Sequence, residues 1–462
     1  MSNINIPRPL GRISLSAALC VMSAIGAGLR ADEIAVTVYN SDLGVISESR
    51  KLEFKRGLGR VEFRDVPSQI DATSVGFRAL DAPGAVTILE QNYQFDLVSP
   101  EKIFDRYIDE SVELTTKEGV IYAGTLLSRA GQGVVLRDSA GGIQIISSGS
   151  VERVNLPKLP TGLITRPTLL WDYTSTRDGA LNCEVSYQTG GLTWSAEYVG
   201  VLNAAETKMD LSGWSSIDNT SGKTYTDAKL KLIAGDIQRA QRGPERMFKG
   251  AMMAEMASAD AVGFEEKAFF EYHLYTLPRP STIANNEIKQ ISLFEPATAS
   301  VSKEFYYTSS EGNRNVDVRL KFKNAREAGL GMPLPEGRVR VFKADTDGSR
   351  ILLGEDRIEH TPKDEEVTLT IGRAFDLVGE ETTVDQRSIS RTVSETDFKI
   401  SLRNRKDERA TIHIVKDLGR YWEITKTSHE FTKKSASRVQ FDIPVDKGAE
   451  VAITFTVRYT YR

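Results

Sequence analysis

From residue 34 onwards, apolar and polar residues alternate in short runs along most of the chain. The runs are separated by Gly, Pro, Asp or Ser, which are residues typical of turns. Apolar residues at every second position place one face of a strand against a core and the other in water. The pattern therefore predicts a mainly β fold: tandem antiparallel β-sandwich domains, with a small SH3-like or Sm-like barrel and one short helix.

The alternation is clearest between residues 191 and 235, which are predicted to form three consecutive strands. Two tryptophans and a tyrosine in this stretch supply large side chains for burial, so it is expected to be the centre of the main core. The run Asn-Thr-Ser-Gly between the second and third strands supplies residues that favour a chain reversal. We expect five residues here to be structural: Trp194, Tyr198, Trp214, Asn219 and Gly222.

One helix is predicted near residue 100. Ser99 can cap it and Pro100 suits the first helical position. An apolar stripe is formed by Ile103, Phe104, Tyr107 and Ile108. Five short strands joined by Gly-rich turns follow and predict the small barrel. The predicted division is a signal peptide (1–31), an N-terminal β region (32–98), the short helix (99–109), the small barrel (110–157), a central β-sandwich (160–310) and a C-terminal β-sandwich (311–462).

Strand periodicity fails between residues 238 and 267, which are rich in Ala, Met, Gly and charged side chains. Such a stretch gains little from burying one face, so a mobile loop within the central sandwich is predicted. The methionines there could also form an adaptable contact surface.

The first 31 residues have the order of a secretory signal peptide. Arg8 and Arg12 precede the apolar run Ile13–Leu29, which ends in small residues. We therefore expect an exported protein, periplasmic or secreted. Cleavage leaves 56 basic and 63 acidic side chains, a net charge near −7, which argues against nucleic acid as a main partner. No later apolar stretch approaches membrane length, so no integral membrane segment is expected after cleavage.

Signatures of catalysis are sparse. Cys183 is the one cysteine left after cleavage and lies on the apolar face of a strand, which predicts a core thiol. The four histidines and this cysteine lack zinc-ligand spacing. The run Ser221–Thr224 resembles the end of a phosphate-binding loop, but Ile217 occupies the position of its first glycine, so a turn is predicted. No catalytic, cofactor-binding or metal-binding residue is predicted.

Several runs together resemble a known family. They are TWSAEY, the Asn219-x-x-Gly222 turn followed by KLKLIAG, the segment Gly331–Gly337 followed by RVRVF, and the closing VRYTY. This set resembles a bacterial domain of unknown function that is also found in mucoidy inhibitor A-like proteins. The resemblance implies an exported, β-rich bacterial protein and offers no established reaction or catalytic residues. Those proteins carry a long coiled coil before the domain, and this chain has no heptad run.

Two kinds of function remain open from the sequence. The first is an envelope-associated β-protein that binds or scaffolds a protein or glycan partner and has no cofactor. The alternative is a carboxylate-dependent hydrolase that acts on glycans or peptides, because acid–base chemistry leaves little trace in a sequence. The missing nucleophile and metal motifs favour the first function. A deep pocket with converging carboxylates or histidines would favour the second.

Overall fold

The computed structural model describes residues 33–96, 99–130, 133–158, 164–235, 238, 264–270 and 272–461. Strands dominate this part of the chain, which confirms the mainly β fold class. The predicted signal peptide lies outside the described residues, as does most of the predicted loop 238–267. The end of that loop is corrected, because residues 265–267 belong to a strand.

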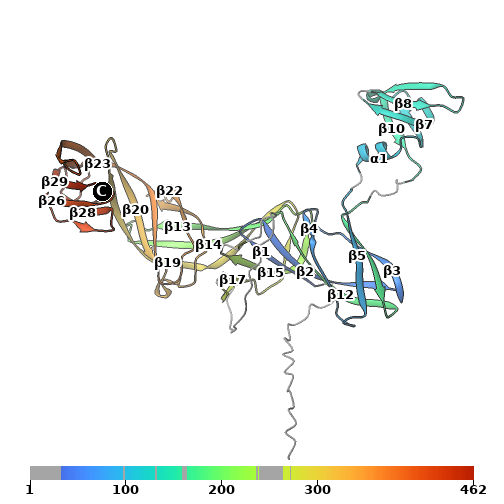
Figure 1. Cartoon of the computed structure of the whole chain (residues 1–462), viewed down its shortest axis with the longest axis horizontal. Coiled ribbons are helices and arrows are strands. Elements are labelled where there is room, and N and C mark those ends of the chain that lie inside the picture. Colours follow the sequence, from blue (N-terminus) through green and yellow to red (C-terminus); the bar gives the residue numbers. More distant parts are fainter. Residues whose placement is uncertain are drawn as a thin grey trace, which may run out of the picture.

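Two sheets contain strands from both the start and the middle of the chain (Figure 1). The larger has the order β16 (Glu265–Phe269), β17 (Tyr272–Thr276), β15 (Tyr225–Ala234), β1 (Ile34–Tyr39), β2 (Leu43–Phe54), β12 (Gly179–Thr189) and β4 (Ile70–Ala79), and β18 (Ser281–Ile283) pairs with β15. The smaller has the order β3 (Gly57–Arg64), β11 (Thr168–Ser175) and β5 (Val86–Gln94).

This interleaving corrects the predicted boundaries at 98 and 160. The strand β2 is antiparallel to β12, from Phe54 opposite Gly179 to Gly44 opposite Thr189. The strand β1 runs parallel to β15. The N-terminal β region and the central region therefore contribute strands to the same two sheets and form one sandwich.

A third sheet continues into the C-terminal part. Its order is β22 (Arg350–Ile358), β21 (Gly337–Ala344), β13 (Leu192–Leu202), β14 (Lys208–Asn219), β19 (Glu287–Ser309), β20 (Asn315–Lys323), β23 (Glu366–Ser390), β24 (Val393–Asn404), β29 (Glu450–Thr460) and β26 (Trp422–Thr427). A covering layer consists of β25 (Ala410–Asp417), β28 (Arg438–Val445) and β27 (Thr432–Lys433). The predicted boundary at 310 is also corrected, since β19 serves both regions.

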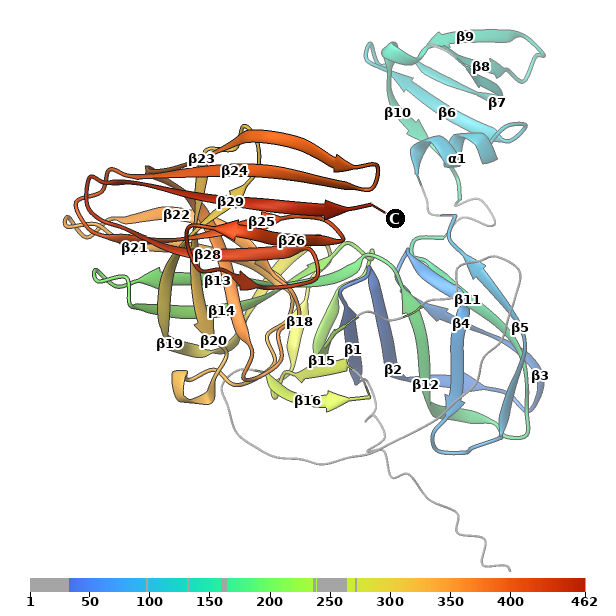
Figure 2. The same cartoon turned by 60° about the vertical axis from the view of Figure 1, so that its left-hand side comes forward.

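The helix and the five short strands form a separate unit, which lies away from the other sheets in both views (Figures 1 and 2). The helix α1 (Pro100–Arg106) is capped as predicted, because Ser99 Oγ accepts a hydrogen bond from the Lys102 amide. The strands follow in the order β10 (Val151–Asn155), β6 (Ser111–Thr116), β7 (Ile121–Ala130), β8 (Gly133–Arg137) and β9 (Ile143–Ser147).

Closure of the predicted small barrel is not seen. Among the described residues β9 and β10 are not paired, although they are consecutive strands. The 3₁₀ turn η1 (Ser148–Ser150) joins them. The unit is an open five-stranded sheet whose apolar face packs against Tyr107 and the preceding helix.

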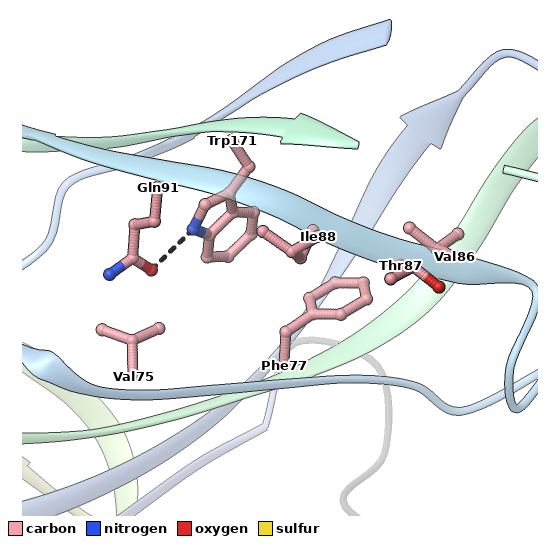
Figure 3. Close-up of a pocket in the computed structure, with 7 residues that line it drawn as sticks. All are labelled: Val75, Phe77, Val86, Thr87, Ile88, Gln91 and Trp171. Carbon is pink, nitrogen blue, oxygen red and sulfur yellow. Dashed lines mark hydrogen bonds between the residues drawn. The ribbon is translucent and has the colours of Figure 1, made fainter. Parts of the chain in front are cut away.

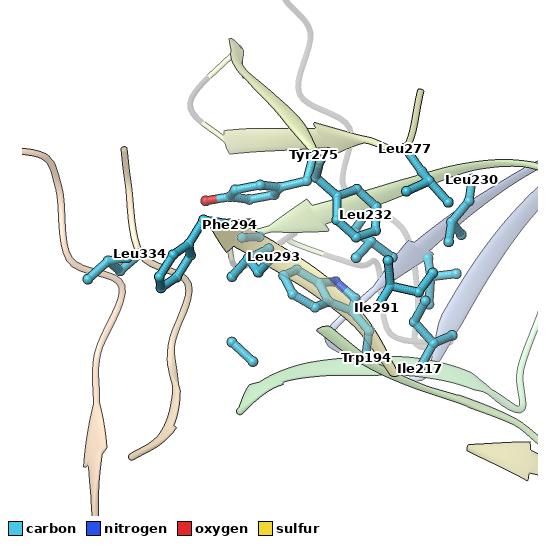
Figure 4. Packing of buried hydrophobic residues seen from close by; sticks show 14 of the residues in the cluster. Trp194, Ile217, Leu230, Leu232, Tyr275, Leu277, Ile291, Leu293, Phe294 and Leu334 are labelled. Atoms are coloured by element: carbon cyan, nitrogen blue, oxygen red, sulfur yellow. The ribbon is translucent and has the colours of Figure 1, made fainter. Parts of the chain in front are cut away.

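The main core surrounds the stretch that shows the clearest alternation (Figure 4). Trp194 is 2% exposed, and its indole nitrogen donates a hydrogen bond to the Ile233 carbonyl at 3.0 Å. The ring of Tyr275 meets it edge-on, with centroids 6.1 Å apart. Leu230 and Leu232 are buried beside it, as their alternation with lysines predicts.

Of the five residues expected to be structural, Trp194, Tyr198 and Asn219 are buried. Gly222 is exposed and lies in a tight turn. Gly222 has φ +91°, and a Cβ there would lie 2.1 Å from Ser68 Oγ, so only glycine fits this turn. The prediction for Trp214 is wrong, because this side chain is not in the core. It is 40% exposed, because alternation places even-numbered positions of β14 on the face opposite the buried Met209, Leu211 and Ile217.

Candidate functional site

The segment Gly331–Gly337 is held by two buried tyrosines, one from the TWSAEY run and one from β17. Tyr198 of the TWSAEY run donates its hydroxyl hydrogen to the Pro335 carbonyl at 2.8 Å. Tyr275 donates to the Pro333 carbonyl at 2.9 Å. Burial raises the pKa of Tyr198 well above its ordinary value, so the hydroxyl stays a donor. These segments therefore have a structural role, in which they align β13 with the parallel strand β21.

The turn between β14 and β15 is also held from within. Asn219 is fully buried, and its amide nitrogen donates to the carbonyls of Lys223 at 2.8 Å and Ile283 at 3.1 Å. Its side-chain oxygen accepts from the Ser221 amide at 3.1 Å and from the Ser221 hydroxyl at 2.7 Å. The turn predicted for residues 221–224 is thereby confirmed, with a fixed conformation.

This turn delivers a charged side chain into the interior. The ammonium nitrogen of Lys223 lies 2.9 and 3.0 Å from the two carboxylate oxygens of Glu48 on β2. The two side chains are 4% and 2% exposed. Tyr187 on β12 donates to the same carboxylate at 2.8 Å, and Arg50 completes the group at 2.7 Å. We call Glu48, Arg50, Tyr187 and Lys223 the buried ion cluster.

The charges of the buried ion cluster support one another. Burial alone would raise the pKa of Glu48, but the attraction of Lys223 and Arg50 outweighs it, and the pKa lies below its ordinary value. Burial and the nearby carboxylate raise the pKa of Tyr187 well above 10. Glu48, Tyr187 and Lys223 are buried, and they connect β2, β12 and the β14–β15 turn. Sequence reasoning identified the turn but missed its buried lysine.

A hollow of about 330 Å³ opens between β4 and β5, and most of the side chains that line it are of apolar types (Figure 3). Trp171 forms its floor and is fully buried, and its indole nitrogen donates to Gln91 Oε1 at 2.8 Å. The Gln91 amide nitrogen in turn donates to the Ala72 carbonyl of β4 at 2.7 Å. We call this hollow the edge groove. Its lining is Val75, Phe77, Val86, Thr87, Ile88, Gln91 and Trp171.

The edge groove lies between two sheet edges. Among the described strands, β4 pairs with β12 alone and β5 pairs with β11 alone. Both ladders have an irregular register, which bends these edges and limits strand-to-strand pairing with other chains. Large apolar side chains remain exposed along β5 and just after it: Leu89 is 53% exposed and Phe95 is 67% exposed.

A second hollow, of about 360 Å³, is polar and lies where β1, β13, β21 and β22 meet. Glu197 there accepts hydrogen bonds from Arg338 at 3.1 Å and from Arg340 at 2.9 Å. Glu336 and Glu359 also line the hollow and are exposed to solvent. Glycosidase-type hydrolysis pairs carboxylates in different environments, one of them apolar. This hollow does not provide that contrast, so it gives the hydrolase alternative no support.

The β13–β14 turn is held by a partly buried ion pair network. Glu206 accepts hydrogen bonds from Lys303 on β19 and, at 2.6 Å, from Lys343 on β21. These bonds lower the pKa of Glu206 to about 2. A carboxyl group whose pKa is lower in the folded state than in the unfolded state stabilises the fold at every pH above its unfolded-state pKa. This stabilisation is lost as the pH falls through the folded-state pKa and the carboxylate is protonated.

We therefore expect Glu206→Gln to remove part of the acid sensitivity of the fold. Stability that the native protein loses between about pH 4.5 and about pH 2 will change less with pH in the variant. Urea midpoints measured across this range check the expectation. An identical pH profile for the two proteins would contradict it.

The remaining candidates for chemistry are accounted for individually. Cys183 is fully buried, and burial raises its pKa to about 12, which confirms the core thiol. His413 lies 2.6 Å from Asp442 on the surface of the C-terminal sandwich. Within the described ranges, no group of three or more His, Cys, Asp and Glu side chains is placed to hold a metal ion. No described helix is long and apolar enough to cross a membrane.

Comparison with known proteins adds no family assignment: no family model and no curated protein matches the chain.

Proposed function

We propose that this chain is an exported, envelope-associated bacterial protein that binds a protein partner and does not catalyse a reaction. The observation that carries the proposal is the edge groove, a hollow open to solvent beside two sheet edges and lined mostly by apolar residue types, with Thr87 and Gln91 among them. Its position on a rigid sandwich suits recognition, because the walls are held by strands on both sides. The signal-like N-terminus and the resemblance to a secreted family support export.

The occupant we propose is an apolar anchor side chain of a partner protein. Val75, Phe77 and Ile88 are half-buried, so each has apolar surface that a partner could cover. Interfaces draw most of their affinity from a few apolar or aromatic anchors seated in such hollows. Leu89 on β5 and Phe95 just after it are further exposed apolar side chains of this part of the chain.

A glycan fits the edge groove less well. Sugar hydroxyls need several free polar partners, and the amide of Gln91 is already bonded at both ends, to Trp171 and to Ala72. Thr87 is the other side-chain hydroxyl or amide in the lining. The groove thus favours a protein partner over the glycan that the sequence left open.

Site-specific photo-crosslinking tests the proposal. A benzophenone side chain placed at the exposed position Thr87 is expected to form discrete adducts with a partner in envelope extracts. Adding Ile88→Asp should abolish the adducts, because a carboxylate would have to enter an apolar hollow. The same photo-probe at Thr411, an exposed strand position of the C-terminal sandwich, is the matched control.

The partner identified by crosslinking is then purified and titrated directly. Ile88→Asp is expected to weaken its binding at least about tenfold, as for an interface hot spot. Equal adducts from Thr87 and Thr411, or unchanged affinity in the variant, would overturn the proposed site. Turnover of cell-wall glycans or peptides, abolished by one carboxylate substitution that leaves the fold intact, would overturn the non-enzyme assignment.

A further inference from the structure

A third hollow, of about 300 Å³, lies where the central and C-terminal cores meet. Leu202 and Leu320 of the central core contribute to its walls, and both are buried. Phe305 and Val318 contribute from the side of the C-terminal core. We call it the junction hollow. It is a separate feature from the edge groove, which is built from β4 and β5 at a distance along the molecule (Figure 1).

The strand β23 opens the junction hollow to solvent. Near Thr370 this strand lies against β22: the backbone amide of Thr370 donates a hydrogen bond to the Asp356 carboxylate at 2.6 Å. Further along, β23 leaves its register with β20: Asp317 is opposite Arg373, whereas Asn315 is opposite Val378. The extra residues form a bulge, a feature that often re-aims side chains at binding sites.

The bulge exposes apolar surface at the entrance. Phe375 lies within it and is 96% exposed, and Leu353 on β22 is 37% exposed. Both residues line the junction hollow. The phenyl ring of Phe375 is almost entirely in water. If it covered a bound ligand, its apolar surface would be removed from water, which lowers the free energy of the complex.

Cations surround the same entrance. The ammonium groups of Lys303 and Lys406 lie 5.8 and 4.8 Å from the ring centre of Phe305. Lys303 is paired with Glu206, and Lys406 with Glu408 at 2.8 Å. The exposed guanidinium of Arg373 differs, because no carboxylate of the described residues lies within 4.0 Å of it.

The carboxylate of Asp376 also lines the hollow and offsets part of its positive charge. Asp376 is exposed and follows Phe375 in the bulge. Glu206 is shared by two lysines, because Lys343 binds it as well as Lys303. Lys406 is already paired with Glu408, so Arg373 is the cation of this lining that remains available to an incoming anion among the described residues.

We propose that the junction hollow binds a monomeric anionic amphiphile, with its alkyl chain on the apolar walls and its acidic head group at Arg373. Apolar walls with a few placed polar groups are the usual composition of a small-molecule site. The guanidinium can hold a carboxylate through two parallel hydrogen bonds. The volume suits one short chain rather than a membrane surface.

Calorimetric titration of the full chain with dodecanoate, below its micelle concentration, tests the proposal. Saturable binding at one site is expected, and dodecyltrimethylammonium should not bind because its charge is reversed. Arg373→Gln is expected to weaken dodecanoate binding about tenfold, the size of a lost charged hydrogen bond. Arg391→Gln, which removes an exposed arginine elsewhere on the β23–β24 hairpin, should leave binding unchanged.

Phe375→Ser should also weaken dodecanoate binding, whereas Val384→Ser, at a 61% exposed position of the same strand, should not. Melting temperatures of the four variants establish that each is folded. Absence of saturable binding, equal binding of the cationic detergent, or indifference to both Arg373→Gln and Phe375→Ser would overturn the proposal. Cosedimentation with phosphatidylglycerol vesicles without binding of monomeric dodecanoate would also overturn it, in favour of a membrane-docking surface.

Discussion

Replacing Glu48 by leucine is expected to destabilise the fold by about 3–5 kcal/mol, the range for breaking a buried ion pair on one side. The substitution removes the carboxylate that neutralises Lys223, whose side chain is 4% exposed. The remaining partner within reach is the Tyr187 hydroxyl, 3.4 Å from the ammonium nitrogen. A buried ammonium with one neutral partner must lose its proton or draw in water, and both are costly.

The double variant Glu48→Leu/Lys223→Met separates the charge effect from packing. It removes both buried charges and should recover most of the lost stability, because apolar replacements of an ion pair are often neutral. Arg50 remains, but its side chain is 25% exposed and can be hydrated. Asp172→Asn is the surface control: its partner Arg60 is 61% exposed, so this change should cost less than about 1 kcal/mol.

Equilibrium urea denaturation followed by circular dichroism measures these differences. The free energy of unfolding is expected to be highest for the native chain, followed by Asp172→Asn and then the double variant, and lowest for Glu48→Leu. A double variant no more stable than Glu48→Leu would show that Glu48 acts through packing or through Arg50 rather than through Lys223. A single variant as stable as the native chain would show that the buried ion cluster contributes nothing to the fold.

Strand positions were largely predictable because alternation depends on neighbours along the chain. The residues of β13 and β15 lie on the faces that the pattern indicates, and the cap at Ser99 follows from local geometry. The partners of each strand were not predictable. The pairing of β2 with β12 joins residues more than a hundred positions apart, and alternation does not specify which strand lies beside which.

The same limit explains what was missed at the candidate sites. The edge groove needs β4, β5 and β11 to meet, and the junction hollow needs a bulge in β23 that has no sequence signature. Lys223 was predicted to lie in a turn, and it does, but its burial was not predicted. Lysine is rarely buried, and its partner Glu48 lies far away in the sequence. Buried charges become visible only when topology brings opposite signs together.

Trp194→Ala is expected to destabilise the fold by about 3–5 kcal/mol, the usual cost of truncating a buried aromatic side chain. The change removes the packing against Tyr275 and leaves a cavity in the main core. It also leaves the Ile233 carbonyl without the indole donor that it accepts from at 3.0 Å. Both effects act where β13 of the third sheet packs against β15 of the larger N-terminal sheet.

Trp214→Ala is the matched control, because Trp214 lies on β14, the neighbour of the strand that carries Trp194, and is 40% exposed. It should cost about 0.5 kcal/mol or little more, as for a surface substitution. Urea denaturation of the two variants under identical conditions measures the contrast. Equal losses would mean that the exposed face of β14 is covered in the folded protein. An unchanged stability of Trp194→Ala with loss of partner binding would instead make Trp194 part of a binding site.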